Sequence, residues 1–141
     1  MGSLLDPSVR KIAVANPLHA PYGRAAVSAM EHFGIYGSVK GKLVLGESIS
    51  QAGQFAQSGA AQVGIIALSI ALSDSMQTGK HWQVPLEAYP PIDQAGVILK
   101  QARKAGHLDA AGAFTKALQS SHGRSVLERY GLSRSTPSSH R

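Results

Sequence analysis

The sequence predicts an α/β fold with a parallel sheet, and two observations carry that prediction. Three short apolar runs have strand character: Lys11–Ala15, Lys42–Leu45 and Gln62–Ala67. A helical segment lies between each run and the next. This strand–helix–strand–helix–strand order favours parallel pairing with right-handed crossovers. In addition, a turn-rich stretch follows each of the first two strands and opens directly into a helix.

The first helix is expected to run from Pro21 to about Phe33, because Ala26, Met30 and Phe33 fall on one stripe and Gly34 supplies a stop. The second helix is expected to begin after Ser48. Gln51 follows that serine by three positions, which is the Ser-x-x-Gln form of a capping box. This helix directs Ile49, Ala52, Phe55 and Ala56 inward and ends at Gly59.

The C-terminal part of the chain predicts a loop at Ser73–His81, a strand at Trp82–Leu86 and a rigid break at Tyr89-Pro90-Pro91, as in a segment that crosses between lobes. The remaining expected elements are a strand at Ile92–Leu99, an amphipathic helix at Leu108–Leu118 with Leu108, Ala111, Phe114 or Thr115, and Leu118 facing inward, and a helix at Ser121–Tyr130 that ends at Gly131. The expected domain limits are residues 5–88 for one lobe, 89–132 for the crossing segment and its helices, and 133–141 for a disordered tail rich in Ser and Arg.

Composition limits the function classes. With 43% hydrophobic and 16% charged residues, the chain of 141 residues is expected to fold as a globular protein. The net charge of +6 is spread along the sequence with no aromatic-interleaved basic stripe, so we do not expect nucleic-acid binding. We expect no signal peptide and no membrane-inserting segment in the sequence as given. Because cysteine is absent, disulfides and thiolate sites are excluded.

Two stretches carry the candidate chemistry: Asn16–Ala26 and Gly46–Gln51. Each is a helix start that follows a strand, and two such starts at neighbouring strand ends can direct several backbone N–H groups to one point. That arrangement indicates oxyanion binding. Catalysis has no support, because the chain carries no nucleophile elbow, phosphate loop or paired carboxylates. The histidines, His19 included, show no metal-ligand spacing and are interpreted as structural or exposed.

A set of motifs in a fixed order resembles one known family. They are Asp6–Pro17, Ala20–Ala26, Gly46–Gln51, Val63–Ser69, Tyr89–Ala95 and Glu128–Gly131. Together they are similar to the periplasmic molybdate-binding proteins of molybdate ABC importers. The resemblance implies the type II periplasmic-binding-protein fold, with one complete lobe followed by a crossing strand and C-terminal helices of the other lobe. It covers only the C-terminal portion of that fold and lacks the first part of the other lobe.

The resemblance also implies the site residues. Oxyanion donors are expected at Tyr22 and Ile49, and Ala67 occupies the place where some family members carry a tyrosine. Pro21, Gly23 and Ser48 are expected to support the helix starts. The implied ligand is molybdate or tungstate, with no cofactor and no enzymatic activity. The implied partner is an ABC permease, and the implied compartment is the periplasm.

Two other interpretations stay open. One is a structural fragment whose apolar faces favour a homodimer, and the other is a cytosolic oxyanion-sensing domain on the same fold. For the receptor hypothesis, we expect the truncation to weaken the binding. If two or three charge-assisted hydrogen bonds are missing, each contributing about 1.5–3 kcal/mol, affinity falls by several orders of magnitude, to the order of millimolar.

Overall fold

The computed structural model describes residues 1–132, which belong to two compact units. Unit 1 is Met1–Ile92, and unit 2 begins at Asp93 and is described as far as Leu132. The tail predicted to be disordered, residues 133–141, lies outside the described residues.

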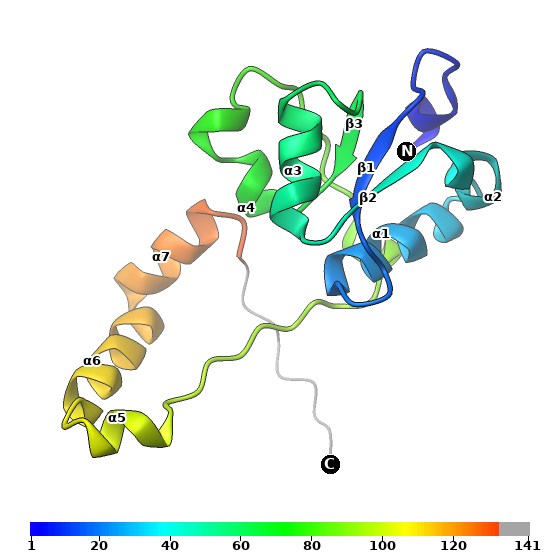
Figure 1. Cartoon of the computed structure of the whole chain (residues 1–141). Helices are drawn as coiled ribbons and strands as arrows, with labels where there is room; N and C mark the ends of the chain where they lie inside the picture. Colours follow the sequence, from blue (N-terminus) through cyan, green and yellow to red (C-terminus); the bar gives the residue numbers. More distant parts are fainter. Residues whose placement is uncertain (133–141) are drawn as a thin grey trace. The chain divides into compact units, whose positions relative to one another are not determined.

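Unit 1 is built on a parallel sheet of three strands, β1 (Ile12–Ala15), β2 (Leu43–Gly46) and β3 (Val63–Ile65), in the order β2-β1-β3 (Figure 1). The central strand β1 is buried along its whole length, as expected of a strand covered on both faces. The predicted α/β class and parallel pairing are therefore confirmed.

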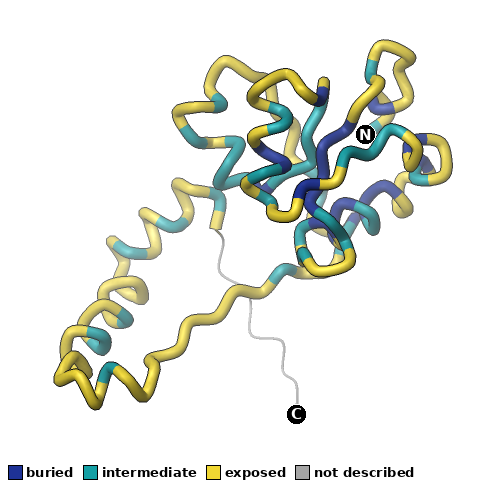
Figure 2. The backbone as a smooth tube through the Cα atoms, in the orientation of Figure 1, coloured by how far each residue is buried: buried dark blue, intermediate teal, exposed yellow. Residues whose placement is uncertain are grey.

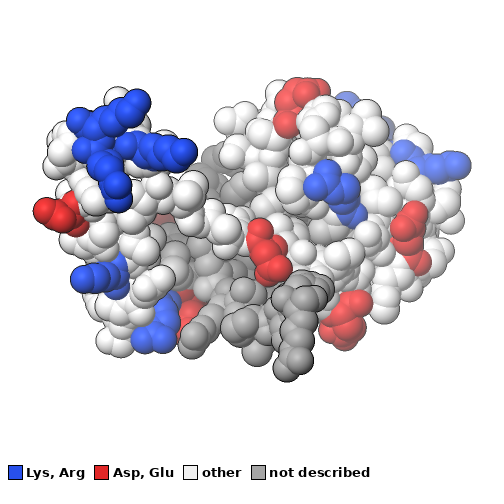
Figure 3. Space-filling model, turned by 90° about the horizontal axis from the view of Figure 1, so that it is seen from below, with Lys and Arg blue, Asp and Glu red and all other residues white. Residues whose placement is uncertain are grey.

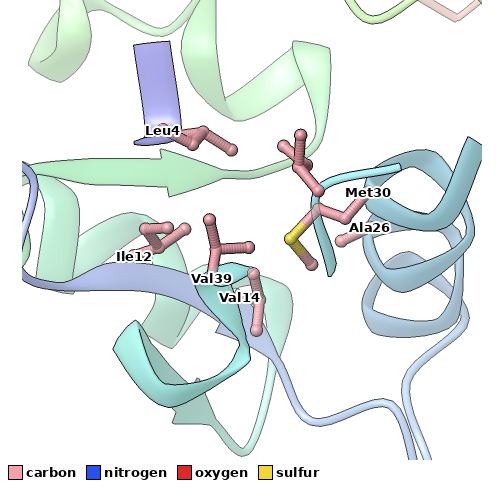
Figure 4. Close-up of a cluster of buried hydrophobic side chains, with 7 residues drawn as sticks. Leu4, Ile12, Val14, Ala26, Met30 and Val39 are labelled. Carbon is pink, nitrogen blue, oxygen red and sulfur yellow. The ribbon is translucent and has the colours of Figure 1, made fainter. Parts of the chain in front are cut away.

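The helices α1 (Pro21–His32) and α3 (Ile49–Gln57) cover opposite faces of the sheet, because successive strand side chains point to opposite sides. On one face, Ile12 and Val14 pack with Ala26 and Met30 of α1 (Figure 4). On the other face, Ala13 packs with Ala52 of α3. These apolar contacts fix where both helices begin relative to the strands.

The predicted stripe of α1 is correct for Ala26 and Met30 but not for Phe33, which is 38% exposed at the C-cap. Phe33 instead makes an edge-to-face contact with Trp82, with the ring centroids 6.2 Å apart. Trp82 lies in a segment that was expected to be a strand, Trp82–Leu86, and that segment forms no strand. Its backbone lacks a sheet neighbour among the described residues, and Pro85 has no N–H to contribute to a ladder.

Short elements complete unit 1. They are η1 (Gly2–Leu5), α2 (Tyr36–Val39), η2 (Lys40–Lys42), α4 (Leu68–Ala71), η3 (Asp74–Met76) and η4 (Leu86–Ala88). Two of them close the core, since Leu4 of η1 and Val39 of α2 join the cluster around Ile12 and Met30.

Unit 2 consists of the helices α5 (Lys100–Lys104), α6 (Leu108–Gln119) and α7 (Ser121–Arg129). The strand predicted at Ile92–Leu99 is not formed; these residues adopt no regular structure. A strand needs a neighbouring strand for its backbone groups, and the described part of the chain offers none to this segment. The last two predicted helices are confirmed, and α7 is followed by Gly131 with a φ of +74°.

The predicted inward face of α6 is wrong for its large side chains. Leu108 and Leu118 are each 40% exposed and Phe114 is 66% exposed, whereas Ala111 and Thr115 are half-buried. From Asp93 to Leu132 no residue is buried, in contrast to the buried strand and helix positions of unit 1 (Figure 2). The periodicity identified the helix correctly, but no surface in unit 2 covers its apolar stripe.

None of the charged residues in the described part of the chain is buried, and Figure 3 shows Lys and Arg gathered at one corner of this face and scattered among Asp and Glu elsewhere. Within residues 1–132, no helix has the length and apolar character needed to cross a membrane.

Candidate oxyanion-binding site

The predicted site residues follow the C-terminal ends of the three parallel strands. In the register of the sheet, Ala15 pairs with Gly46 and Val14 pairs with Ile65, so the three strands end at one edge. A hydrogen bond of 2.7 Å from the Asn16 N–H to the Gly46 carbonyl extends the pairing past the end of β1. The loops that leave β1, β2 and β3 therefore begin side by side.

The loop Asn16–Ala20, called the α1 loop below, is organised around Asn16. The Asn16 side-chain Oδ1 accepts from the Leu18 N–H (3.1 Å), and its carbonyl accepts from the N–H groups of His19 (3.3 Å) and Ala20 (2.9 Å). Ala20 is the N-cap of α1 and gives no side-chain cap, while Pro21 occupies the first helical position, where its missing N–H costs nothing.

Two glycines allow the helices to approach the strand ends closely. A Cβ on Gly23 would overlap the Ala15 carbonyl oxygen and lie 2.8 Å from the Pro17 nitrogen, and a Cβ on Gly46 would lie 2.8 Å from the Ala52 nitrogen. In both places the obstacle is backbone, which cannot move aside as a side chain can. Gly23 therefore supports the start of α1 by permitting contact with the strand.

The start of α3 is capped by its own sequence. Ser48 is the N-cap, and its hydroxyl oxygen accepts from the Gln51 N–H at 3.1 Å. The Gln51 side-chain oxygen in turn accepts from the Glu47 N–H at 2.7 Å. The predicted capping interaction is confirmed, with the returning bond made to Glu47, one residue before the N-cap.

Tyr22 and Ile49 occupy the first turns of α1 and α3, and both are half-buried. As the first residue of α3, Ile49 has no acceptor within its own helix for its N–H. The two helices cover opposite faces of the sheet. Their first turns are nevertheless near the same edge of the sheet, because both helices follow the C-terminal ends of adjacent parallel strands.

Ala67 follows β3 at the same edge and is 4% exposed. It is the N-cap of α4, and its carbonyl accepts from the N–H groups of Ile70 (3.0 Å) and Ala71 (3.1 Å). Its methyl side chain has no hydroxyl to donate, so any phenolic donor at this edge comes from another position.

Tyr89 is a residue that the sequence interpretation did not assign to the site. It follows η4, which packs on α1 and buries Ala88. Desolvation by burial raises the pKa of the Tyr89 phenol, and the neighbouring Tyr22 raises it further. The two phenols are therefore near enough to interact electrostatically, although 67 positions of sequence (89 minus 22) separate them and no local pattern links them.

His19 and Glu47 are also brought together by the fold, with His19 Nε2 and Glu47 Oε2 3.2 Å apart. This contact joins the α1 loop to the loop before α3. The sequence analysis interpreted His19 as structural or exposed; its side chain is 54% exposed, but it has a specific partner.

A surface hollow of about 450 Å³ lies elsewhere, lined by Arg10, Lys11, Gly59, Ala60 and Gln62. These residues precede β1 and β3, so the hollow is at the N-terminal edge of the sheet, away from Tyr22 and Ile49. The described residues contain no group of three or more His, Asp or Glu side chains that could hold a metal ion.

Residues 1–133 match the model of the bacterial extracellular solute-binding protein family. The chain belongs to this family. Among curated relatives of the family, it is 37% identical over 130 residues to the molybdate-binding protein ModA of Rhodobacter capsulatus and 39% identical over 132 residues to that of Azotobacter vinelandii. These matches cover 92% of the chain in both cases, and 50% and 51% of the relatives. The resemblance inferred from the motifs is confirmed.

Solved structures of the family agree. The periplasmic molybdate-binding protein of Azotobacter vinelandii superimposes with a TM-score of 0.80 at 30% identity, covering 94% of this chain and 58% of that one. The substrate-binding domain of a putative molybdenum ABC transporter from Clostridium difficile gives a TM-score of 0.70 at 23% identity, covering 96% of this chain and 58% of that domain, and shows the same fold. The chain spans about half the length of the curated relatives that it matches.

Proposed function

We propose that this chain is the oxyanion-binding lobe of a solute-binding protein that delivers molybdate or tungstate to an ABC permease in the periplasm. The observation that carries the proposal is the placement of Tyr22, Ile49 and Ala67 after three adjacent parallel strand ends. The relatives named as molybdate-binding proteins support the choice of ligand.

The chemistry of this edge suits a bare tetrahedral dianion. Molybdate oxygens accept hydrogen bonds and do not donate them, so backbone N–H and phenol O–H donors satisfy them. Phosphate that carries a proton also needs an acceptor, and a cage of donors disfavours it. In this proposal, Tyr22 offers its phenol and backbone N–H, Ile49 offers its N–H, and Ala67 closes the edge with an apolar methyl.

Calorimetric titration tests the ligand. We expect molybdate and tungstate to release or absorb heat on binding, and phosphate at neutral pH to do so more weakly or not at all. A chimera in which the N-terminal half of the Rhodobacter capsulatus relative precedes this chain should bind more tightly than the chain alone, because more donors surround the anion. No heat and no thermal shift from both proteins would end the proposal.

The backbone donor at Ile49 can be removed with little change to the helix. In Ile49→Pro the N–H is lost, while proline is favoured at the first helical position and Ser48 before it already has extended backbone angles of −138° and 164°. We expect affinity to fall about ten- to hundredfold, as for one charge-assisted hydrogen bond. Ile49→Val keeps the N–H and a β-branched side chain and should bind as the wild type does.

The phenol of Tyr22 is tested in the same way. Tyr22→Phe keeps the ring and removes the hydroxyl, and we expect affinity to fall about tenfold or more. Tyr36→Phe is the matched control, because Tyr36 packs against the core cluster of Leu4 and Met30. Equal affinities of the two variants would remove the Tyr22 hydroxyl from the site.

A second candidate function is association with a second copy of the chain. It is favoured by the apolar side chains that unit 2 leaves exposed, among them Val97 at 81%, Leu99 at 65% and Phe114 at 66%. Exposed apolar surface of this kind promotes association. Sedimentation at micromolar concentration should then reveal dimers, whereas a clean monomer would exclude this function.

A further inference from the structure

We propose that His19 and Glu47 form a positioning pair that ties the α1 loop to the loop before α3 and so sets the spacing of the oxyanion donors behind each loop. This inference rests on the proposed function and adds two residues to the same site. Neither residue is a donor to the anion in this arrangement. Their role is to hold the strand-end loops that carry Tyr22 and Ile49.

Each of the two loops is held by hydrogen bonds of its own, so the contact between them joins two ordered turns. On the α1 side, Asn16 fixes His19 through the bond from the His19 N–H to the Asn16 carbonyl. On the α3 side, the Gln51 side chain fixes the Glu47 N–H, and Ser48 caps the helix. The side-chain contact of 3.2 Å between His19 and Glu47 therefore joins two preformed turns.

The contact is positioned to affect the donors. His19 precedes Tyr22 by three residues, and Glu47 precedes Ile49 by two, so each partner lies in the turn that leads into a donor. The hydrogen bond from the Asn16 N–H to the Gly46 carbonyl also joins the two segments, but it lies at the strand ends. The side-chain pair fixes the loops farther from the sheet.

The charge of Glu47 and its contact with His19 can be removed separately by different substitutions. Its carboxylate is 78% exposed, and a negative charge near a dianion site repels the ligand. Glu47→Gln removes that charge but keeps a side-chain oxygen that can accept from His19. Glu47→Ala removes the same charge and also the contact. The two variants therefore differ in the tie between the loops and not in charge.

The test titrates molybdate into the wild type and five variants at one ionic strength. We expect Glu47→Gln to bind as tightly as the wild type or more tightly, and Glu47→Ala to bind about fivefold more weakly than Glu47→Gln. His19→Ala should also weaken binding, and combining it with Glu47→Ala should cost no more than His19→Ala alone. Glu31→Gln removes a charge near the end of α1, away from the loops, and should leave affinity unchanged.

Amide hydrogen exchange of the Ala20 and Gln51 N–H groups supplies a second readout that needs no ligand. Exchange should be faster in Glu47→Ala than in Glu47→Gln, because a loop that is no longer tied opens more often. If the wild type binds and both Glu47 variants share one affinity and one exchange rate, the positioning role is wrong. If the wild type binds no molybdate while the exchange rates differ as expected, the tie exists and the oxyanion function is wrong.

Discussion

Unit 1 and unit 2 both contain well-formed helices, but only the helices of unit 1 pack against buried apolar side chains. In unit 1, Ile12, Val14 and Met30 are fully buried between the sheet and α1, and Ala52 is fully buried on the other face. In unit 2, no residue from Asp93 to Leu132 is buried. Among the described residues, a packed core therefore belongs to unit 1 alone.

Helix capping by serine and close backbone packing at glycine occur in both units. Ser48 caps α3 through the Gln51 N–H at 3.1 Å, and Ser120 caps α7 through the Gly123 N–H at 3.0 Å. Close backbone approach also recurs, since a Cβ on Gly123 would meet carbonyl oxygens at the end of α6. Capping and turns thus place helices in either unit, whereas tertiary packing supplies most of the stability of a helix. The comparison predicts that equivalent substitutions will have unequal effects.

The largest contrast is expected from truncating one buried and one exposed apolar side chain. Met30→Ala removes a side chain with no exposure and should lower the free energy of unfolding of unit 1 by about 2–5 kcal/mol. Phe114→Ala, at 66% exposure, should change stability by less than about 0.5 kcal/mol. Urea denaturation can be followed by the fluorescence of Trp82, the single tryptophan of the chain, which contacts Phe33 in unit 1. Equal losses would mean that Phe114 is covered in solution.

Glycine substitutions should differ in sign. Gly23→Ala places a Cβ against the end of β1 and should destabilise unit 1 by about 1–3 kcal/mol. Gly112 lies in α6 with nothing within 4 Å of an added Cβ, so Gly112→Ala should increase the helix stability by about 0.5–1 kcal/mol. Thermal unfolding followed by circular dichroism measures both. A stable Gly23→Ala variant with unchanged molybdate affinity would contradict the close approach.

Removing either serine N-cap should destabilise its own helix by a similar free energy, but the two changes should appear in different measurements. Ser48→Ala and Ser120→Ala each lose one cap bond, which is worth about 1 kcal/mol. In unit 1 the loss should appear in the cooperative unfolding transition seen by Trp82. In unit 2 it should appear as faster amide exchange in α7, with the Trp82 transition unchanged. A shift of that transition in Ser120→Ala would show that the two units unfold together.

The sequence predicted unit 1 well because its local signals and its tertiary contacts agree. The apolar run at Ile12–Ala15 is a buried strand, Ser48 with Gln51 is a cap, and Gly34 ends α1 with a φ of +67°. The prediction of a strand at Ile92–Leu99 was wrong, because these apolar residues form a strand only when another strand pairs with their backbone groups. The strand propensity of a segment does not reveal whether the fold provides such a partner.

The site was predictable in part for the same reason. Helix starts after parallel strands can be read locally, so the sequence predicted the two helix-start stretches. The choice of Tyr22 and Ile49 within them came from the family resemblance. The approach of Tyr89 to Tyr22 and of His19 to Glu47 depends on how η4 and the strand-end loops pack. Residues 28 positions apart, such as His19 and Glu47, carry no spacing signal.

The smallest expected effect concerns Tyr89, near the end of unit 1. Its pKa is raised above the ordinary 10.0, mainly by burial and further by Tyr22, so the folded protein keeps the phenolic proton at pH values where the unfolded chain loses it. The resulting contribution to stability is present below pH 10.0 and is lost as pH rises through the raised pKa of Tyr89. Tyr22→Phe should lower the pKa of Tyr89 toward its ordinary value without reaching it, because burial remains. Ultraviolet absorbance titration, with Tyr89→Phe to assign the step, measures this shift. An unchanged titration in Tyr22→Phe would show that the two phenols are not neighbours, and would leave burial within unit 1 as the whole cause.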